Sequence, residues 1–113
     1  MQRQYLGELE QVVLLALLRL GDGAYGVSIR QEIRDCTGRS ITPGTIYPTL
    51  DRLERKGLVR SFVGDATPER GGRAKRHFTL EREGLDALRR SQRMLSSLAN
   101  GLDAELSAKG SQT

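Results

Sequence analysis

The sequence predicts a mainly helical α+β fold in which three helices are followed by two strands and a long last helix. Apolar residues recur at helical spacing in three segments before residue 57. Two short strand-like segments follow, separated by a run rich in glycine and charged residues. The C-terminal part then returns to apolar residues in alternating steps of three and four, which is typical of a helix that packs along one face.

The composition fits one basic globular domain. With 113 residues the chain is long enough to bury a single core. Charged residues make up 28% and hydrophobic residues 37%, which favours a folded chain over a disordered one. The net charge of +4 is concentrated, because residues 39–76 hold nine basic and four acidic side chains and the rest of the chain carries −1. A basic balance of this kind permits a polyanionic partner, and the positive charge lies in the middle third of the chain.

The start of the chain and its cysteine content indicate a cytoplasmic protein without a membrane partner. Charged residues at Arg3, Glu8 and Glu10 interrupt the N-terminus, so no secretory signal is expected. The apolar run 12–18 is shorter than the roughly 20 residues of a membrane span. A lone cysteine, Cys36, cannot form an intrachain disulfide.

The first two helices are predicted at residues 6–20 and 25–36. The Gly-Asp-Gly turn at residues 21–23 ends the first helix, and Gly38 suits a left-handed cap after the second. Because the first helix is apolar on more than one face, we expect a partner subunit to cover one side of it.

The third helix has the best-marked start of all. Thr42 is expected to cap it with its side chain, and Pro43 fits the first helical position. Gly57 ends the helix, and Pro48 is expected to cause a local kink. The apolar face consists of Ile46, Leu50 and Leu53, with Ile41 packing on Ile46 as a staple, whereas Thr45, Thr49, Arg52 and Lys56 are expected to point away from it.

A hairpin and a long helix complete the chain. Strands are predicted at residues 58–63 and 75–80, around a turn that is basic at its far end. The last helix is predicted over residues 81–106, with an apolar seam at Leu85, Leu88, Gln92, Leu95, Ala99, Leu102 and Leu106. We therefore expect a winged helix-turn-helix DNA-binding domain at residues 1–80, a dimerisation helix at 81–108 and a disordered tail at 109–113.

Two strings in this order resemble the signature of the PadR-like transcriptional regulators. They are GTIYPTLDRLERKGLV at residues 44–59 and GGRAKRHFTLEREG at residues 71–84. The resemblance implies a homodimer that binds double-stranded DNA at a pseudo-palindromic operator, usually as a repressor. It also implies a small-molecule effector, because many family members lose operator affinity when such a ligand binds. Repression and activation both remain open from the residues themselves.

Three groups of residues are expected to carry this function. The start of the third helix supplies DNA contacts through Ser40, Thr42, Gly44, Thr45, Tyr47, Thr49 and Arg52. The hairpin supplies Arg70, Gly72, Arg73, Lys75 and Arg76. Dimerisation is expected at Leu9, Val13, Leu17, Leu85, Leu88, Leu95, Leu98, Leu102 and Leu106. The resemblance is the main reason for giving Tyr47 a phosphate contact instead of a packing role.

The sequence offers no catalytic, metal or cofactor site, so an enzyme is not expected. His77 stands alone and is expected to be structural. Cys36 is expected to be a small packed residue and not a redox sensor. Two alternatives to a DNA-binding regulator stay open: a winged helix that binds proteins, and a sensor whose main output is ligand binding at the centre of a dimer.

Overall fold

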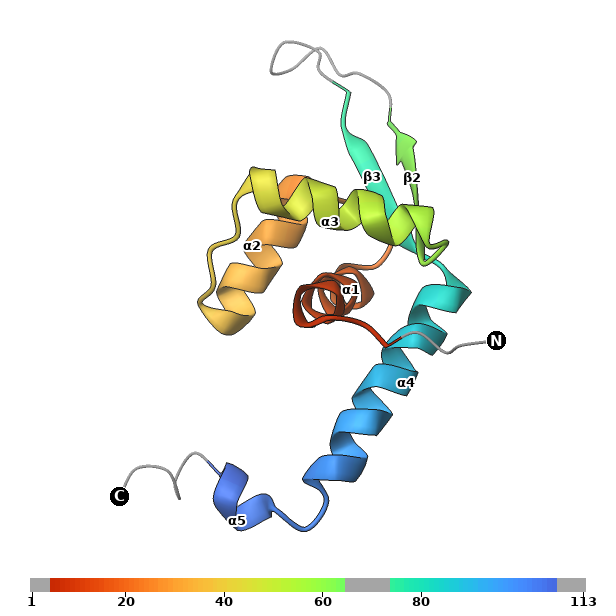
Figure 1. Cartoon of the computed structure of the whole chain (residues 1–113). Helices are drawn as coiled ribbons and strands as arrows, with labels where there is room; N and C mark the ends of the chain where they lie inside the picture. Colours follow the sequence, from red (N-terminus) through yellow and green to blue (C-terminus); the bar gives the residue numbers. More distant parts are fainter. Residues whose placement is uncertain (1–4, 65–73, 108–113) are drawn as a thin grey trace.

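The computed structural model describes residues 5–64 and 74–107, and it has the predicted order of three helices, a hairpin and a last helix (Figure 1). The elements are α1 (Glu8–Leu20), β1 (Ala24–Tyr25), α2 (Gly26–Thr37), α3 (Pro43–Arg55), β2 (Val59–Val63), β3 (Arg76–Leu80), α4 (Arg82–Ala99) and α5 (Asp103–Leu106). The predicted fold class is therefore confirmed. Two short elements, β1 and α5, were not predicted.

Helix α1 is the centre of the fold. It packs against α2, α3, α4 and β3, and Figure 1 shows it beneath α3 while the β2–β3 hairpin rises beside that helix. Fully buried apolar side chains come from α1, α2, α3 and β3: Val13, Leu14, Ile29, Ile46, Leu50, Leu53 and Phe78 each have 0% exposure. The arrangement is a winged helix, in which the hairpin is the wing.

The sheet has three antiparallel strands in the order β1-β3-β2. Ala24 of β1 pairs with Phe78 of β3, and Ser61 of β2 pairs with the same residue from the other side. Phe78 thus lies in the middle strand with its side chain in the core. Each hairpin strand begins one residue later than predicted, at Val59 and Arg76.

Helix α3 begins at the predicted residue but is capped differently. The Thr42 carbonyl accepts hydrogen bonds from Thr45 N at 3.0 Å and Ile46 N at 2.9 Å. The Thr42 hydroxyl makes no capping bond to the helix backbone and instead donates to Thr45 Oγ1 at 3.2 Å, so the predicted side-chain cap is wrong. Pro48 lies inside the helix without ending it. At the end of α2, Gly38 has φ +78°, which confirms the left-handed cap.

The predicted last helix is wrong in its extent. Helix α4 ends at Ala99, Gly101 has φ +85°, and the chain turns before the short helix α5 (Figure 1). A left-handed residue cannot continue an α-helix, so the seam is divided at this point. Most of the expected hairpin turn (65–73) and the expected disordered tail lie outside the described residues.

Candidate nucleic-acid interface

The first turn of α3 and the loop before it form an exposed polar surface. Ser40, Thr42, Gly44 and Thr45 are all exposed, as expected for DNA contact. Their side chains are short, so a phosphate or a base edge can approach the backbone closely. The N-terminal end of a helix also carries partial positive charge from its free N–H groups, which favours an anion.

Tyr47 lies beside this surface and packs against the start of α2. A Cβ added to Gly26 would overlap the hydroxyl and the ring of Tyr47, so the tyrosine fits only because residue 26 is glycine. Tyr47 nevertheless keeps 36% of its surface exposed. It therefore packs within the domain and still presents one side to solvent, and its phosphate contact stays a prediction.

Thr49 does not belong to the exposed surface, which corrects the expectation for this residue. Its side chain is 2% exposed, and its hydroxyl donates a hydrogen bond to the Thr45 carbonyl at 2.9 Å. Thr49 follows Ile46 by three residues and precedes Leu53 by four, and this spacing places it on the buried face of the helix.

Arg52 is exposed but is paired with a carboxylate of α1. Its Nε lies 3.4 Å from Glu10 Oε2, and Lys56 Nζ lies 2.7 Å from the same oxygen. Burial by itself would raise the pKa of Glu10, but hydrogen bonds from Lys56, the Gly7 N–H and Arg52 lower it below its ordinary value. The sequence reasoning missed Glu10, although an acidic residue at the start of an apolar helix was a usable signal.

Arg76 of the wing is held by two carboxylates of α3. Its guanidinium lies 3.0 Å from Asp51 Oδ1 and 2.7 Å from Glu54 Oε1, and it stacks over the Phe78 ring at 4.8 Å. Glu54 also accepts hydrogen bonds from the Ser61 hydroxyl and N–H, and these contacts, followed by Arg76, lower the pKa of Glu54. The structure therefore places Arg76 in a strand–helix link with 37% of its side chain exposed, and its contact with DNA stays a prediction.

Lys75 is an exposed cation just before β3, opposite Gly64 in the hairpin. Its Nζ lies 4.4 Å from the centroid of the Tyr25 ring, and its carbonyl accepts a hydrogen bond from Gly64 N at 2.8 Å. The backbone is thus held in place while the ammonium group remains accessible. The other hairpin residues expected to contact DNA, Arg70, Gly72 and Arg73, lie outside the described residues.

His77 has a structural environment. Its ring stacks on Phe62, with 5.2 Å between the ring centroids, and it meets the Tyr25 ring edge-on with 5.7 Å between centroids. Its Nδ1 lies 2.7 Å from the Gly23 carbonyl oxygen. Among residues 5–64 and 74–107, no group of three histidine, cysteine or acidic side chains could hold a metal ion.

Two further arginines flank α3 and were not selected from the sequence. Arg39 precedes the helix and lies 3.2 Å from Glu8 in an exposed ion pair. Arg55, in the last turn, is exposed and has no acidic partner in the described part of the chain. Their position beside a predicted helix-turn-helix was the signal that could have found them.

Comparison with known families identifies this arrangement. The model of the transcriptional regulator PadR-like family matches residues 14–90, which is more than half of the chain. The chain belongs to the PadR-like family. Members of this family are DNA-binding transcription regulators and not enzymes. Along residues 5–64 and 74–107, every helix is too short or too polar to cross a membrane.

Individual relatives support this family membership. The transcriptional regulator Rv3488 of Mycobacterium tuberculosis is 38% identical over 75 residues, which cover 66% of this chain and 65% of that protein. The transcriptional activator GvpE of Haloferax mediterranei is 35% identical over 57 residues, 50% of this chain and 29% of the activator. The chain thus spans less than a third of the length of the GvpE activators that it matches. A crystal structure of a PadR family regulator from Eggerthella lenta has a TM-score of 0.68 and 29% identity, covering 89% of this chain and 88% of that one.

The apolar residues expected at the dimer contact of this PadR-like chain differ in their exposure. Val13, Leu17 and Leu88 are 0%, 2% and 3% exposed, so they pack inside one chain, which corrects their expected place in a dimer contact. Leu9 and Leu85 are half-buried. The exposed members of the expected set are Leu95, Leu98, Leu102 and Leu106, at 48%, 72%, 45% and 64% exposure. We call these four residues the C-terminal leucines.

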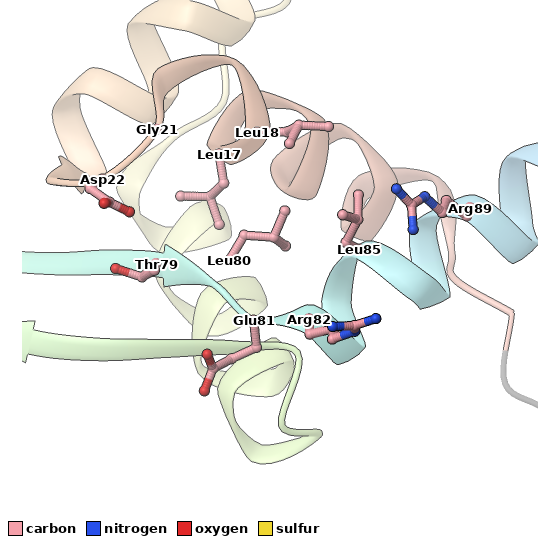
Figure 2. Close-up of a pocket in the computed structure, with 10 residues that line it drawn as sticks. All are labelled: Leu17, Leu18, Gly21, Asp22, Thr79, Leu80, Glu81, Arg82, Leu85 and Arg89. Carbon is pink, nitrogen blue, oxygen red and sulfur yellow. The ribbon is translucent and has the colours of Figure 1, made fainter.

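A hollow of about 460 Å³ lies between the end of α1, β3 and the start of α4. Figure 2 shows the side chains of Leu17, Leu80 and Leu85 facing one another across it, while charged side chains including Glu81 and Arg82 lie at its edge. Its lining is about equally polar and apolar, and the hollow is open to solvent.

Cys36 is exposed, and the expectation of a packed cysteine is wrong. Its Sγ lies 3.5 Å from Glu32 Oε2, and Glu32 in turn pairs with Arg19 Nε at 2.7 Å. These residues border a small groove between α1 and α2 whose walls are mostly apolar, including Leu15 and Ile33.

Proposed function

We propose that this protein is a transcriptional repressor that acts as a homodimer on a pseudo-palindromic operator. The observation that carries the proposal is the exposed first turn of α3 beside the rising β2–β3 hairpin (Figure 1). In this geometry the turn enters the major groove while the hairpin reaches the flanking backbone. A dimer bound across two successive major grooves covers the site and excludes the transcription machinery, so repression needs no further domain.

The proposed DNA contacts are those that the structure leaves accessible. Ser40, Thr42, Gly44, Thr45 and Tyr47 face the groove and its phosphates, and Lys75 neutralises a flanking phosphate. Arg52 remains among the proposed DNA contacts, because 45% of its side chain is exposed although its Nε is paired with Glu10. The bound DNA lies in the cytoplasm in this account.

The proposed dimer contact consists of the C-terminal leucines. Four large apolar side chains between the last turns of α4 and the end of α5 would form an unusual solvent-facing patch on a monomer. Burying them against a second copy with two-fold symmetry would form a self-complementary contact, in which the same leucines of both subunits take part. A small-molecule effector is proposed for the hollow in Figure 2, since this hollow borders the start of α4.

Selection of bound fragments from a genomic library tests the proposal directly. The expected result is a two-fold symmetric sequence with half-sites separated by about 10 base pairs, together with lower reporter expression from a promoter that contains it. Selection of an asymmetric sequence would contradict the dimer, and higher reporter expression would contradict repression. If no sequence is enriched and pull-downs recover a protein partner instead, the protein-binding alternative is correct.

A further inference from the structure

Glu10 joins helix α1 to the C-terminal half of α3 through a nearly buried carboxylate. Only 8% of its side chain is exposed, yet it accepts hydrogen bonds from Lys56 Nζ at 2.7 Å, Arg52 Nε at 3.4 Å and Gly7 N at 3.0 Å. Arg52 belongs to α3, the helix that the proposed function places on DNA, and Lys56 is the residue that follows its last turn. Because a buried carboxylate needs several donors, the two side chains are held toward α1.

The same turn of the chain is tied to α4 from its other side. Leu6 N donates to the hydroxyl of Ser91, which is fully buried, at 2.9 Å. One residue further along α4, Gln92 Nε2 donates to Gln11 Oε1 at 2.7 Å, and Gln11 Nε2 donates to the Leu6 carbonyl at 3.2 Å. Residues 6–11 are therefore hydrogen-bonded to α4 on one side and to α3 on the other.

We propose that Glu10 is a positioning residue for DNA binding and that it transmits the position of α4 to α3. This inference rests on the proposed function, since α3 must contact DNA. A displacement of α4 moves Ser91, and the turn at residues 6–11 moves with it because Leu6 is hydrogen-bonded to Ser91. The hydrogen bonds from Arg52 and Lys56 to Glu10 then lengthen or break. The exposed part of α4 that follows Ser91 carries the proposed dimer contact, so subunit association and the DNA-facing charge are linked within one chain.

Glu10 also sets how many cations α3 offers to phosphates. While it holds Arg52 and Lys56, the two side chains are restricted and their charge is partly neutralised, which limits contacts with any duplex regardless of sequence. Freeing them adds electrostatic contacts that carry no sequence information, and it moves Arg52 away from the position in which it contacts the operator. The positioning role therefore predicts a loss of sequence preference, whereas a purely structural role predicts an equal loss of binding to every duplex.

The test compares wild-type protein with Glu10→Gln on the selected operator and on a random duplex over a range of salt concentrations. The glutamine keeps the shape and removes the charge. The expected result on the random duplex is a log–log salt slope steeper by about one for each cation released. The ratio of operator to random affinity should fall about tenfold, the order of one lost base contact. Glu32→Gln is the matched control, because Glu32 pairs with Arg19 on the far side of α1 and should leave both quantities unchanged.

A second variant keeps the test decisive if Glu10→Gln folds poorly. Ser91→Ala removes the α4 end of the connection and should steepen the same slope by a smaller amount. In a folded double variant, adding Ser91→Ala to Glu10→Gln should not change the salt slope any further. Unchanged slope and unchanged affinity ratio in both variants, with normal operator binding by the wild type, would overturn the inference alone. A wild type that binds neither duplex would overturn the proposed function and the inference together.

Discussion

The hydroxyl of Tyr47 lies where a side chain on Gly26 would have to be. A Cβ built on Gly26 overlaps both the hydroxyl and the ring of Tyr47, and Gly26 is buried at the first position of α2. The glycine thus lets α3 approach α2 closely enough for a tyrosine to bridge them. One close approach both fixes the angle between two helices and sets how far Tyr47 projects toward solvent.

Gly26→Ala is expected to destabilise the protein and to weaken DNA binding. Gly26 does not have a positive φ, so alanine is acceptable to the backbone and the overlap with Tyr47 is the source of the cost. Overpacking of this kind costs about 1–3 kcal/mol. Urea unfolding measures the loss of stability. Titration with operator DNA measures the loss of affinity that follows from displacing the Tyr47 side chain.

The double variant provides the control for this prediction. In a Tyr47→Ala background there is no ring to displace, so the added cost of Gly26→Ala should nearly vanish. An equal cost in both backgrounds would mean that the alanine acts on the backbone of α2 and not on Tyr47. Tyr47→Phe separates the hydroxyl from the ring in the DNA-binding measurement.

Local signals in the sequence predicted most of the fold. Helices α1 to α3 begin and end within two residues of their predicted limits, because Gly21, Gly38, Thr42 and Pro43 mark their ends. Strand β1 has two residues and no repeating pattern, so its pairing with β3 depends on tertiary structure alone. The end of α4 was missed because the apolar spacing continues beyond residue 101. This spacing was given more weight than the helix-breaking signal of Gly101.

The candidate site was harder to predict than the fold, because pairing partners lie far apart in the chain. Arg52 and Glu10 are separated by 42 residues, and Arg76 and Glu54 by 22. A basic residue beside a predicted helix looks the same from the sequence whether its charge is free or neutralised. The expectation for Thr49 was wrong for a different reason. A polar residue is normally expected on the exposed face of a helix, but the Thr49 hydroxyl can be buried because it donates a hydrogen bond to the backbone of the same helix.

The stability of the fold is expected to fall at acidic pH, partly through Glu54. Hydrogen bonds from Ser61 and Arg76 hold the pKa of Glu54 below its ordinary value of 4.5 in the folded protein. The unfolded chain therefore binds a proton more readily, so the stabilisation is present above pH 4.5 and is lost as the pH falls through the lowered folded pKa. Unfolding free energies measured from about pH 7 to about pH 3 check this.

Glu54→Gln isolates that contribution. The variant should be less stable than wild type at neutral pH, and its stability should depend less on pH below 4.5. Glu10 also has a lowered pKa, so some acid sensitivity will persist in the variant. If the pH dependence of the variant matched that of the wild type, Glu54 would have no part in acid unfolding.

Lys75 and Arg76 are neighbours in the chain, but replacing them by alanine is expected to change different properties. Lys75→Ala should affect DNA binding, and Arg76→Ala should affect folding stability. Lys75→Ala should weaken binding to all duplexes and make the salt slope shallower by about one, because an accessible ammonium group is lost. Arg76→Ala removes the partner of Asp51 and Glu54 and should lower the unfolding free energy by about 1 kcal/mol, with little change in slope. Parallel salt titrations and urea melts distinguish the two, and identical slopes in both variants would reassign Arg76 to DNA.

Leu98→Glu is expected to separate the subunits without unfolding them. Leu98 is 72% exposed in the single chain, so a charge there costs the isolated subunit little, but in the proposed dimer it would be buried without a partner. Sedimentation should show a monomer with a normal helical spectrum and with a much larger loss of affinity for the operator than for a random duplex. Ser96→Glu places the same charge on α4 two residues away, on a different side of the helix, and should remain dimeric. A dimeric Leu98→Glu protein would require another interface.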